Sequence, residues 1–130
     1  FEQCSLLQQI TLPISIDEIG DNAFEKCVSL TTIIVPAACR SIGSAAFRDC
    51  SGFMRIELPA ALKKIGSNAF AQCVSLRDVV CYSPMPPTMT RSTFKGVPVA
   101  ACTVYIPKGA KNTYRKDKTW NRLPKIVEQF

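Results

Sequence analysis

Phenylalanine and cysteine recur along this chain of 130 residues with a 23-residue period. The phenylalanines are Phe1, Phe24, Phe47 and Phe70, and Phe94 follows one position late. The cysteines are Cys4, Cys27, Cys50 and Cys73. Pro13, Pro36 and Pro59 keep the same spacing, as do three Ile-Gly pairs at 19–20, 42–43 and 65–66. A unit this short cannot enclose its own apolar side chains, so the copies must stack into a solenoid with about 4.8 Å between neighbouring strands.

The sequence of one copy predicts the local structure of one turn of the solenoid, which we call a rung. Residues 30–35 are rich in β-branched side chains and end at Pro36, which predicts a short strand. The period of two places Ile33 and Val35 on the inner face, and Thr32 and Ile34 on the outer one. A second short extended piece follows and ends at Gly43. A short turn of helix is then expected from a Ser or Asp cap through the Ala-Phe-Cys positions, with caps at Asp21, Ser44 and Ser67.

The chain divides into three parts on this pattern. Residues 1–82 hold four tandem repeats, residues 83–107 form a degenerate last repeat with a proline-rich loop, and residues 108–130 form a basic cap. We expect Tyr114, Trp120, Leu123 and Ile126 to cover the last rung, since a solenoid end otherwise exposes its apolar columns. Phe1 starts in mid-pattern, so we expect further repeats to precede it in a longer protein. An uncapped first rung would allow end-to-end self-association.

The pattern F-x-x-C-x-x-L-x-x-I-x-[LV]-P-x-x-x-x-x-I-G-x-x-A-F resembles the leucine-rich repeats of the BspA-like bacterial surface proteins. The segments 94–97 and 104–109, with Tyr114, Trp120 and 125–128, resemble the C-terminal cap of that family. The resemblance implies a leucine-rich-repeat solenoid, a right-handed α/β-type superhelix made mostly of short strands. It also implies an extracellular or cell-surface protein, with some members of the family acting in adhesion to host matrix proteins.

The positive charge of the chain is local. Residues 1–107 carry nine basic and eight acidic side chains, whereas residues 108–130 carry seven basic and two acidic ones. The basic side chains of the tail are Lys108, Lys111, Arg115, Lys116, Lys118, Arg122 and Lys125. This segment could attract an anionic glycan, or it could be a solvated cap. No aromatic-interleaved basic motif accompanies it, so we expect no nucleic-acid partner.

Several classes of function are disfavoured by composition. Histidine is absent, which removes the commonest general base and the commonest zinc ligand. No C-x-x-C pair and no glycine-rich phosphate loop occurs, and the single glycines recur where a turn could need a positive φ. We therefore expect no enzyme, no metal and no cofactor. The apolar runs are too short to insert into a membrane.

The seven cysteines allow two interpretations. Four form the 23-residue ladder, and Cys39 and Cys81 replace apolar residues in their columns, which favours buried thiols that act as small hydrophobic side chains. Disulfides are the alternative, because an extracellular location permits them and adjacent rungs lie within bridging distance. Parallel side-chain directions and the odd total favour thiols.

What remains for function is the outer face of the strands, which is the usual binding surface of solenoids. Alternation assigns to it Gln9, Thr11, Thr32, Ile34, Arg55, Glu57, Asp78, Val80 and Tyr105. Apolar, aromatic and arginine side chains together are typical of a surface that binds protein. The sequence thus predicts a non-catalytic repeat module for protein–protein binding or adhesion. The alternatives are a structural spacer within a larger surface protein and anionic-glycan binding through the cap.

Overall fold

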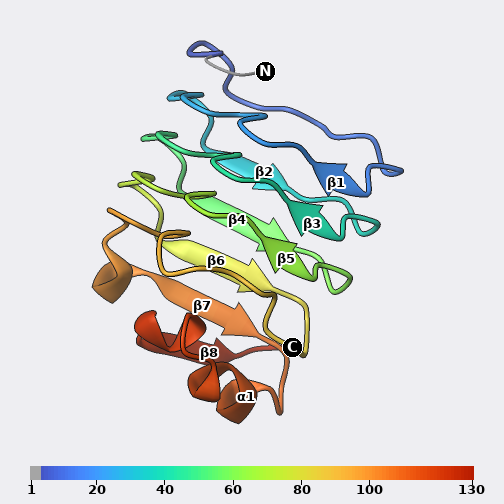
Figure 1. Ribbon diagram of the computed structural model, residues 1–130, viewed down its shortest axis with the longest axis vertical. Helices are drawn as coiled ribbons and strands as arrows, with labels where there is room; N and C mark the ends of the chain where they lie inside the picture. Colours follow the sequence, from blue (N-terminus) through green and yellow to red (C-terminus); the bar gives the residue numbers. More distant parts are fainter. Residues whose placement is uncertain (1–3) are drawn as a thin grey trace.

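The computed structural model describes residues 4–130, so Phe1 lies outside the described part. The chain winds into rungs that stack along the longest axis of the molecule, from the N-terminal segment to a helical cap (Figure 1). The strands form two all-parallel sheets. The smaller sheet contains β1 (Glu18–Ile19), β3 (Ser41–Ile42) and β5 (Lys64–Ile65). The larger sheet contains, in order, β2 (Thr32–Ile34), β4 (Arg55–Leu58), β6 (Asp78–Cys81), β7 (Thr103–Ile106) and β8 (Lys125–Glu128).

Strand register follows the repeat. Ile33 of β2 lies beside Ile56 of β4, and Ile56 lies beside Val79 of β6, so each pairing joins equivalent positions of consecutive repeats. The spacing then changes, because Val79 pairs with Val104 of β7, and Val104 pairs with Ile126 of β8. The expected repeat solenoid is confirmed, with β8 adding the last strand of the larger sheet.

The phenylalanine column forms the centre of the core. Phe24, Phe47, Phe70 and Phe94 stack in succession, with ring centroids 5.3, 5.4 and 5.3 Å apart. Phe94 then meets the edge of Trp120 at 6.2 Å, so the stack continues into the cap. All five side chains are buried, and each new rung covers the apolar surface that the preceding rung leaves open.

The expected helical turns are wrong, because these segments are successive tight turns. Asn22 and Lys26 have φ of 59° and 63°, and the equivalent residues of the next two copies are also left-handed. The amides of Asn22, Phe24 and Lys26 donate to the carbonyls of the next rung at 2.9, 2.7 and 2.8 Å. An α-helix would direct those amides to the fourth preceding carbonyl of its own rung. Stacking therefore replaces the helix with hydrogen bonds between rungs.

Glycine is required in the second and third Ile-Gly pairs for a different reason from the positive φ that the sequence indicated. Positive φ among the described glycines occurs at Gly96 and Gly109, outside these pairs. A Cβ on Gly43 or Gly66 would lie 2.5 Å from a backbone nitrogen of the preceding rung, whereas one on Gly20 meets no atom of residues 4–130 within 4 Å. Close approach of neighbouring rungs therefore requires glycine at 43 and 66.

The first repeat departs from the expected strand. Gln9 and Thr11 are exposed and belong to no strand, so their assignment to the strand face is wrong. A cavity of about 360 Å³ lies between residues 9–14 and β2. None of the described residues of the first copy forms a strand beside the edge of β2.

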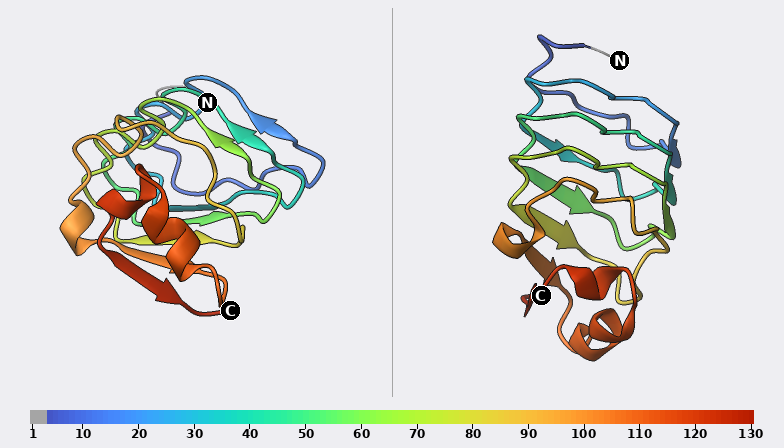
Figure 2. Two further views of the ribbon diagram at one scale, coloured as in Figure 1. Left: turned by 60° about the horizontal axis from the view of Figure 1, so that its bottom comes forward. Right: turned by 60° about the vertical axis from the view of Figure 1, so that its left-hand side comes forward.

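The cap closes the other end of the coil. It contains the helix α1 (Lys111–Lys116) and the 3₁₀ turn η2 (Trp120–Arg122), which lie across the last rung (Figure 2), whereas the 3₁₀ turn η1 (Val99–Ala101) precedes β7. Tyr114 and Trp120 are fully buried, and Leu123 and Ile126 are nearly so, as expected. The indole Nε1 of Trp120 donates to the Pro87 carbonyl at 2.9 Å, and the Tyr114 hydroxyl donates to the Ser83 carbonyl at 2.6 Å. Within residues 4–130 no helix has the length and apolarity to cross a membrane.

Candidate protein-binding face

The outer face of the larger sheet carries two rows of side chains, because equivalent residues of neighbouring strands lie side by side. The first row runs across the sheet through Thr32, Arg55, Asp78, Thr103 and Lys125. The second row runs through Ile34, Glu57, Val80, Tyr105 and Val127. We call these two rows the strand face. The structure thus brings together the site residues expected from Thr32 onward.

Charge on the strand face is concentrated at its centre. The Arg55 guanidinium lies 3.9 Å from a carboxylate oxygen of Glu57 and 3.9 Å from one of Asp78. All three side chains are half-buried, and pairs this open contribute about 0.2–1 kcal/mol each to stability. Their main effect is to hold a positive group between two negative ones on the surface.

The structure corrects the expected exposure of Val80. Only 1% of its surface is exposed, although alternation places it on the outer face. Its neighbours across the sheet are Glu57 and Tyr105, whose longer side chains flank it at strand spacing. Val80 therefore supports its neighbours and offers no surface of its own.

Beside the strand face lies an apolar hollow that the sequence prediction missed. Ile14, Ile34 and Pro36 line both the cavity next to β2 and a second cavity of about 440 Å³ that extends to Pro59 and Tyr82. Ile14 is 89% exposed and Ile34 is 66% exposed. We call this region, at the C-terminal ends of β2 and β4, the strand-end hollow. Ile34 belongs to both the hollow and the strand face, so the two form one continuous surface.

Tyr82 forms the wall of the strand-end hollow. Its hydroxyl donates to a carboxylate oxygen of Glu57 at 2.9 Å, and its ring packs against Phe130 with centroids 4.6 Å apart. The hydrogen bond to Glu57 raises the pKa of the Tyr82 phenol. Two substitutions in the repeat columns signal the hollow: Tyr82 stands where earlier copies have proline, and Ile14 stands where the second and third copies have alanine.

The cysteine thiols are buried and hydrogen-bonded. The seven cysteines are thiols, of which six are buried and Cys4 is partly exposed. The thiols of Cys50 and Cys73 donate to the carbonyls of Phe24 and Phe47 at 3.0 Å, and that of Cys102 donates to the Leu76 carbonyl at 2.9 Å. Burial raises the pKa of Cys50 to about 12 and also raises that of Cys73. These thiols therefore stay protonated and join successive rungs, which is opposite to what a nucleophile needs.

Metal binding has no visible basis in the described part of the chain. No three cysteine, aspartate or glutamate side chains of residues 4–130 gather closely enough to hold an ion.

Comparison with known families decides what the stacked copies are. The model of the BspA type leucine-rich repeat region, with six copies, matches residues 1–105. This chain belongs to the BspA-type leucine-rich-repeat family. No curated protein matches its sequence.

Membership in the BspA-type family gives the general character of this chain. The family consists of repeat modules for protein binding or surface display, is generally non-catalytic and is typically surface-associated. Leucine-rich repeats generally mediate interactions between proteins. In this chain the strand face and the strand-end hollow form one continuous surface on these repeats.

Proposed function

We propose that this chain is a non-catalytic module, outside the cell or on its surface, that binds a protein partner through the strand face and the strand-end hollow. The observation that carries the proposal is Ile34, a large apolar side chain that is 66% exposed beside two apolar cavities and a row of charged groups. Protein interfaces combine apolar anchors with a polar rim in this way. By the family's general character, a host matrix protein is the first partner to test.

The test compares capture of extracellular-matrix and serum proteins by the unchanged chain and by two variants. The face variant carries Ile34→Ser, Arg55→Ser, Glu57→Ser and Tyr105→Ser. The control variant carries Val28→Ser and Val74→Ser, because these apolar side chains are 41% and 46% exposed but precede the strands of the larger sheet. Both variants must keep the thermal unfolding transition of the unchanged chain.

A partner retained by the control variant and lost by the face variant supports the proposal. A partner retained by both variants contradicts it. If no partner is captured, the chain is better described as a structural spacer that displays neighbouring parts of a larger protein.

The basic cap provides a second candidate function, binding of an anionic glycan. Its basic side chains take part in none of the ion pairs found among residues 4–130, and most of them are exposed. Replacing Lys111, Arg115, Lys116 and Lys118 by glutamine is expected to abolish retention on a sulfated glycan column if this function exists. Unchanged retention would exclude the cap as the glycan site.

A further inference from the structure

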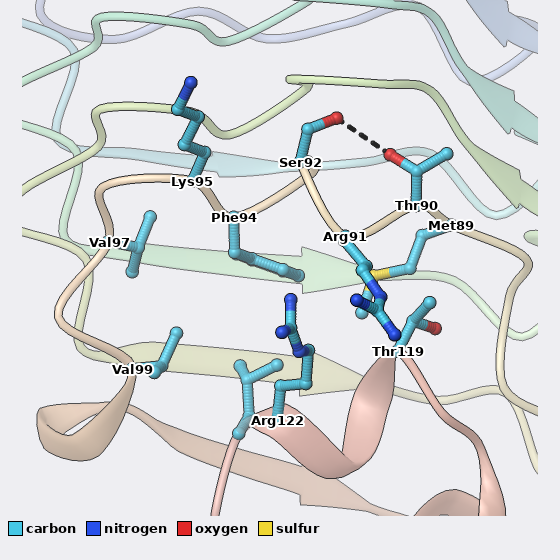
Figure 3. Close-up of a pocket in the computed structure, with 11 residues that line it drawn as sticks. Met89, Thr90, Arg91, Ser92, Phe94, Lys95, Val97, Val99, Thr119 and Arg122 are labelled. Atoms are coloured by element: carbon cyan, nitrogen blue, oxygen red, sulfur yellow. Dashed lines mark hydrogen bonds between the residues drawn. The ribbon is translucent and has the colours of Figure 1, made fainter.

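A third cavity, separate from the strand face, lies where the repeats meet the cap. Its volume is about 570 Å³, and it lies between the 89–99 segment and residues 119–123 (Figure 3). The floor is apolar: Met89, Phe94 and Val97 are each 7% exposed, and Leu123 is 1% exposed. A cavity of this size with an apolar floor is typical of a site for a small ligand or a single side chain.

The rim of this cavity is cationic. Arg91, Lys95 and Arg122 line it and are exposed, and none of the aspartates and glutamates of residues 4–130 lines it. None of the three takes part in the ion pairs found among residues 4–130. Figure 3 shows the guanidinium groups of Arg91 and Arg122 pointing toward the space between their two segments, whereas the Lys95 side chain points away. Two arginines are therefore available to an anion that enters this space.

Hydrogen bonds fix the backbone of the two segments that carry Arg91 and Arg122. On one side, the buried Thr93 hydroxyl donates to the Gly66 carbonyl at 3.1 Å, and the Phe70 amide donates to the Thr93 carbonyl at 2.9 Å. On the other side, the Asp117 carboxylate accepts the amides of Thr119 and Trp120 at 2.9 and 3.1 Å. Fixed segments lower the entropic cost of bringing two cations to one ligand.

The repeat spacing changes in the segment that lines the cavity. Phe94 follows Phe70 one position later than the repeat predicts. Thr103 of β7 pairs with Asp78 of β6, although the repeat would bring Ala101 to that place. The 23-residue register therefore changes between the fourth copy and the cap. The segment that carries Arg91 and Lys95 lies within this change of spacing, and η2 faces it.

We propose that this junction cavity binds a carboxylate attached to an apolar group about the size of an aromatic ring. Planar guanidinium groups match the two oxygens of a carboxylate, and the floor of Met89, Phe94 and Leu123 contacts the apolar part. Such a ligand is either a free aromatic acid or the C-terminal carboxylate of a peptide that ends in an apolar residue. The site is independent of the strand face, so it stands or fails separately from the proposed function.

The test is a titration of the isotope-labelled chain followed by NMR. The probes are phenylacetate, a short peptide ending in phenylalanine, that peptide with a C-terminal amide, phenylacetamide and inorganic phosphate. We expect saturable shifts for phenylacetate or the carboxylate peptide, with a Kd on the order of 1 mM or below, since exposed cations are partly screened. Whichever of the two saturates at the lower concentration identifies the source of the ligand. Much weaker binding of the other three probes is expected, because the peptide amide and phenylacetamide lack the carboxylate and inorganic phosphate lacks the apolar group.

Variants locate the site. Arg91→Gln or Arg122→Gln is expected to weaken binding about tenfold, the loss typical of one charge-assisted contact. Arg115→Gln is the matched control, since Arg115 is an exposed arginine of the cap that does not line the cavity. The proposal is overturned by the absence of saturable shifts for both carboxylates. It is also overturned if phosphate or phenylacetamide binds as tightly, or if Arg115→Gln weakens binding as much as Arg122→Gln.

Discussion

At the scale of single residues, the close stacking of the rungs explains which residue types occupy the repeat positions. A buried thiol is small enough for the core and still donates to the carbonyl of a neighbouring rung, as Cys50 and Cys73 do. Alanine would fit into the same space but remove this hydrogen bond. The cysteine column thus combines packing with hydrogen bonding, which its apolar neighbours cannot do.

The thiols make the fold sensitive to alkali. Burial raises the pKa of Cys50, Cys73 and Cys81 in the folded state, so an unfolded chain releases these protons at a lower pH than the folded one does. Their stabilising effect is complete below the ordinary thiol pKa and declines as pH rises above it, by up to about 1.4 kcal/mol per pH unit for each thiol. Thermal unfolding under reducing conditions should therefore show a steep fall in Tm between about pH 8 and pH 10. A flat profile would contradict protonated, buried thiols.

The state of the thiols can be checked by alkylation without reductant. In the folded chain we expect Cys4 to react fastest, because the other six are buried. After denaturation, all seven should be labelled. Labelling of only one cysteine in the denatured chain would show that the remaining six are paired in disulfides.

The repeat glycines allow a matched comparison of residues at equivalent positions. Gly66→Ala would place a Cβ 2.5 Å from the Ser44 nitrogen, and we expect it to lower the free energy of unfolding by about 1–3 kcal/mol. Gly20→Ala places its Cβ more than 4 Å from every other described residue apart from its chain neighbours, so it should be neutral or slightly stabilising. Chemical denaturation of the two variants measures the difference. Equal effects would mean that backbone flexibility, and not contact between rungs, determines these positions.

Structural elements differ in how far sequence reasoning predicts them. The strand of the second copy is predictable because β-branched residues and a terminal proline define it locally, and the repeat alignment carries the prediction to the third and fourth copies. The turns at Asn22 and Lys26 are not, because only stacking supplies carbonyl partners for the turn amides. Val80 is missed for a similar reason, since its burial depends on the length of the neighbouring side chains. Tyr82 and Ile14 could have been found, because each breaks a repeat column.

The cap is the element that ends the stack. Asp117 holds η2 in place, and although burial opposes its ionisation, hydrogen bonds from Thr119 and Trp120 outweigh burial and lower its pKa. Trp120 is fully buried against Phe94 and Tyr114. Trp120→Ala should cost about 3–5 kcal/mol, since it opens a cavity at the end of the core.

Tyr114→Phe is a milder test of the same element. It keeps the ring and removes the hydroxyl that donates to the Ser83 carbonyl, so we expect a loss of about 1–3 kcal/mol. Denaturation curves of the two variants should rank Trp120→Ala as the more damaging. The reverse order would mean that the hydrogen bond, and not burial, secures the cap.

At the scale of the whole molecule, the charge distribution separates the two candidate binding functions. The strand face mixes apolar and paired charged groups, whereas the cap carries a net positive charge. Binding through the strand face should change little between about 0.15 M and 0.5 M salt, and binding of a sulfated glycan through the cap should weaken steeply. Measuring affinity for each captured ligand at both salt concentrations assigns it to one surface.

The most direct measurement places a photo-activated cross-linking residue on the strand face. Thr32 is the position of choice, because it is exposed and lies in the same strand as Ile34. Matched chains carry the cross-linker at Val74, before the strands, or at Lys116 of the cap. We expect the captured partner to be cross-linked covalently from position 32 and not from positions 74 or 116. Cross-linking from position 74 or 116 with none from position 32 would contradict the strand face as the binding surface.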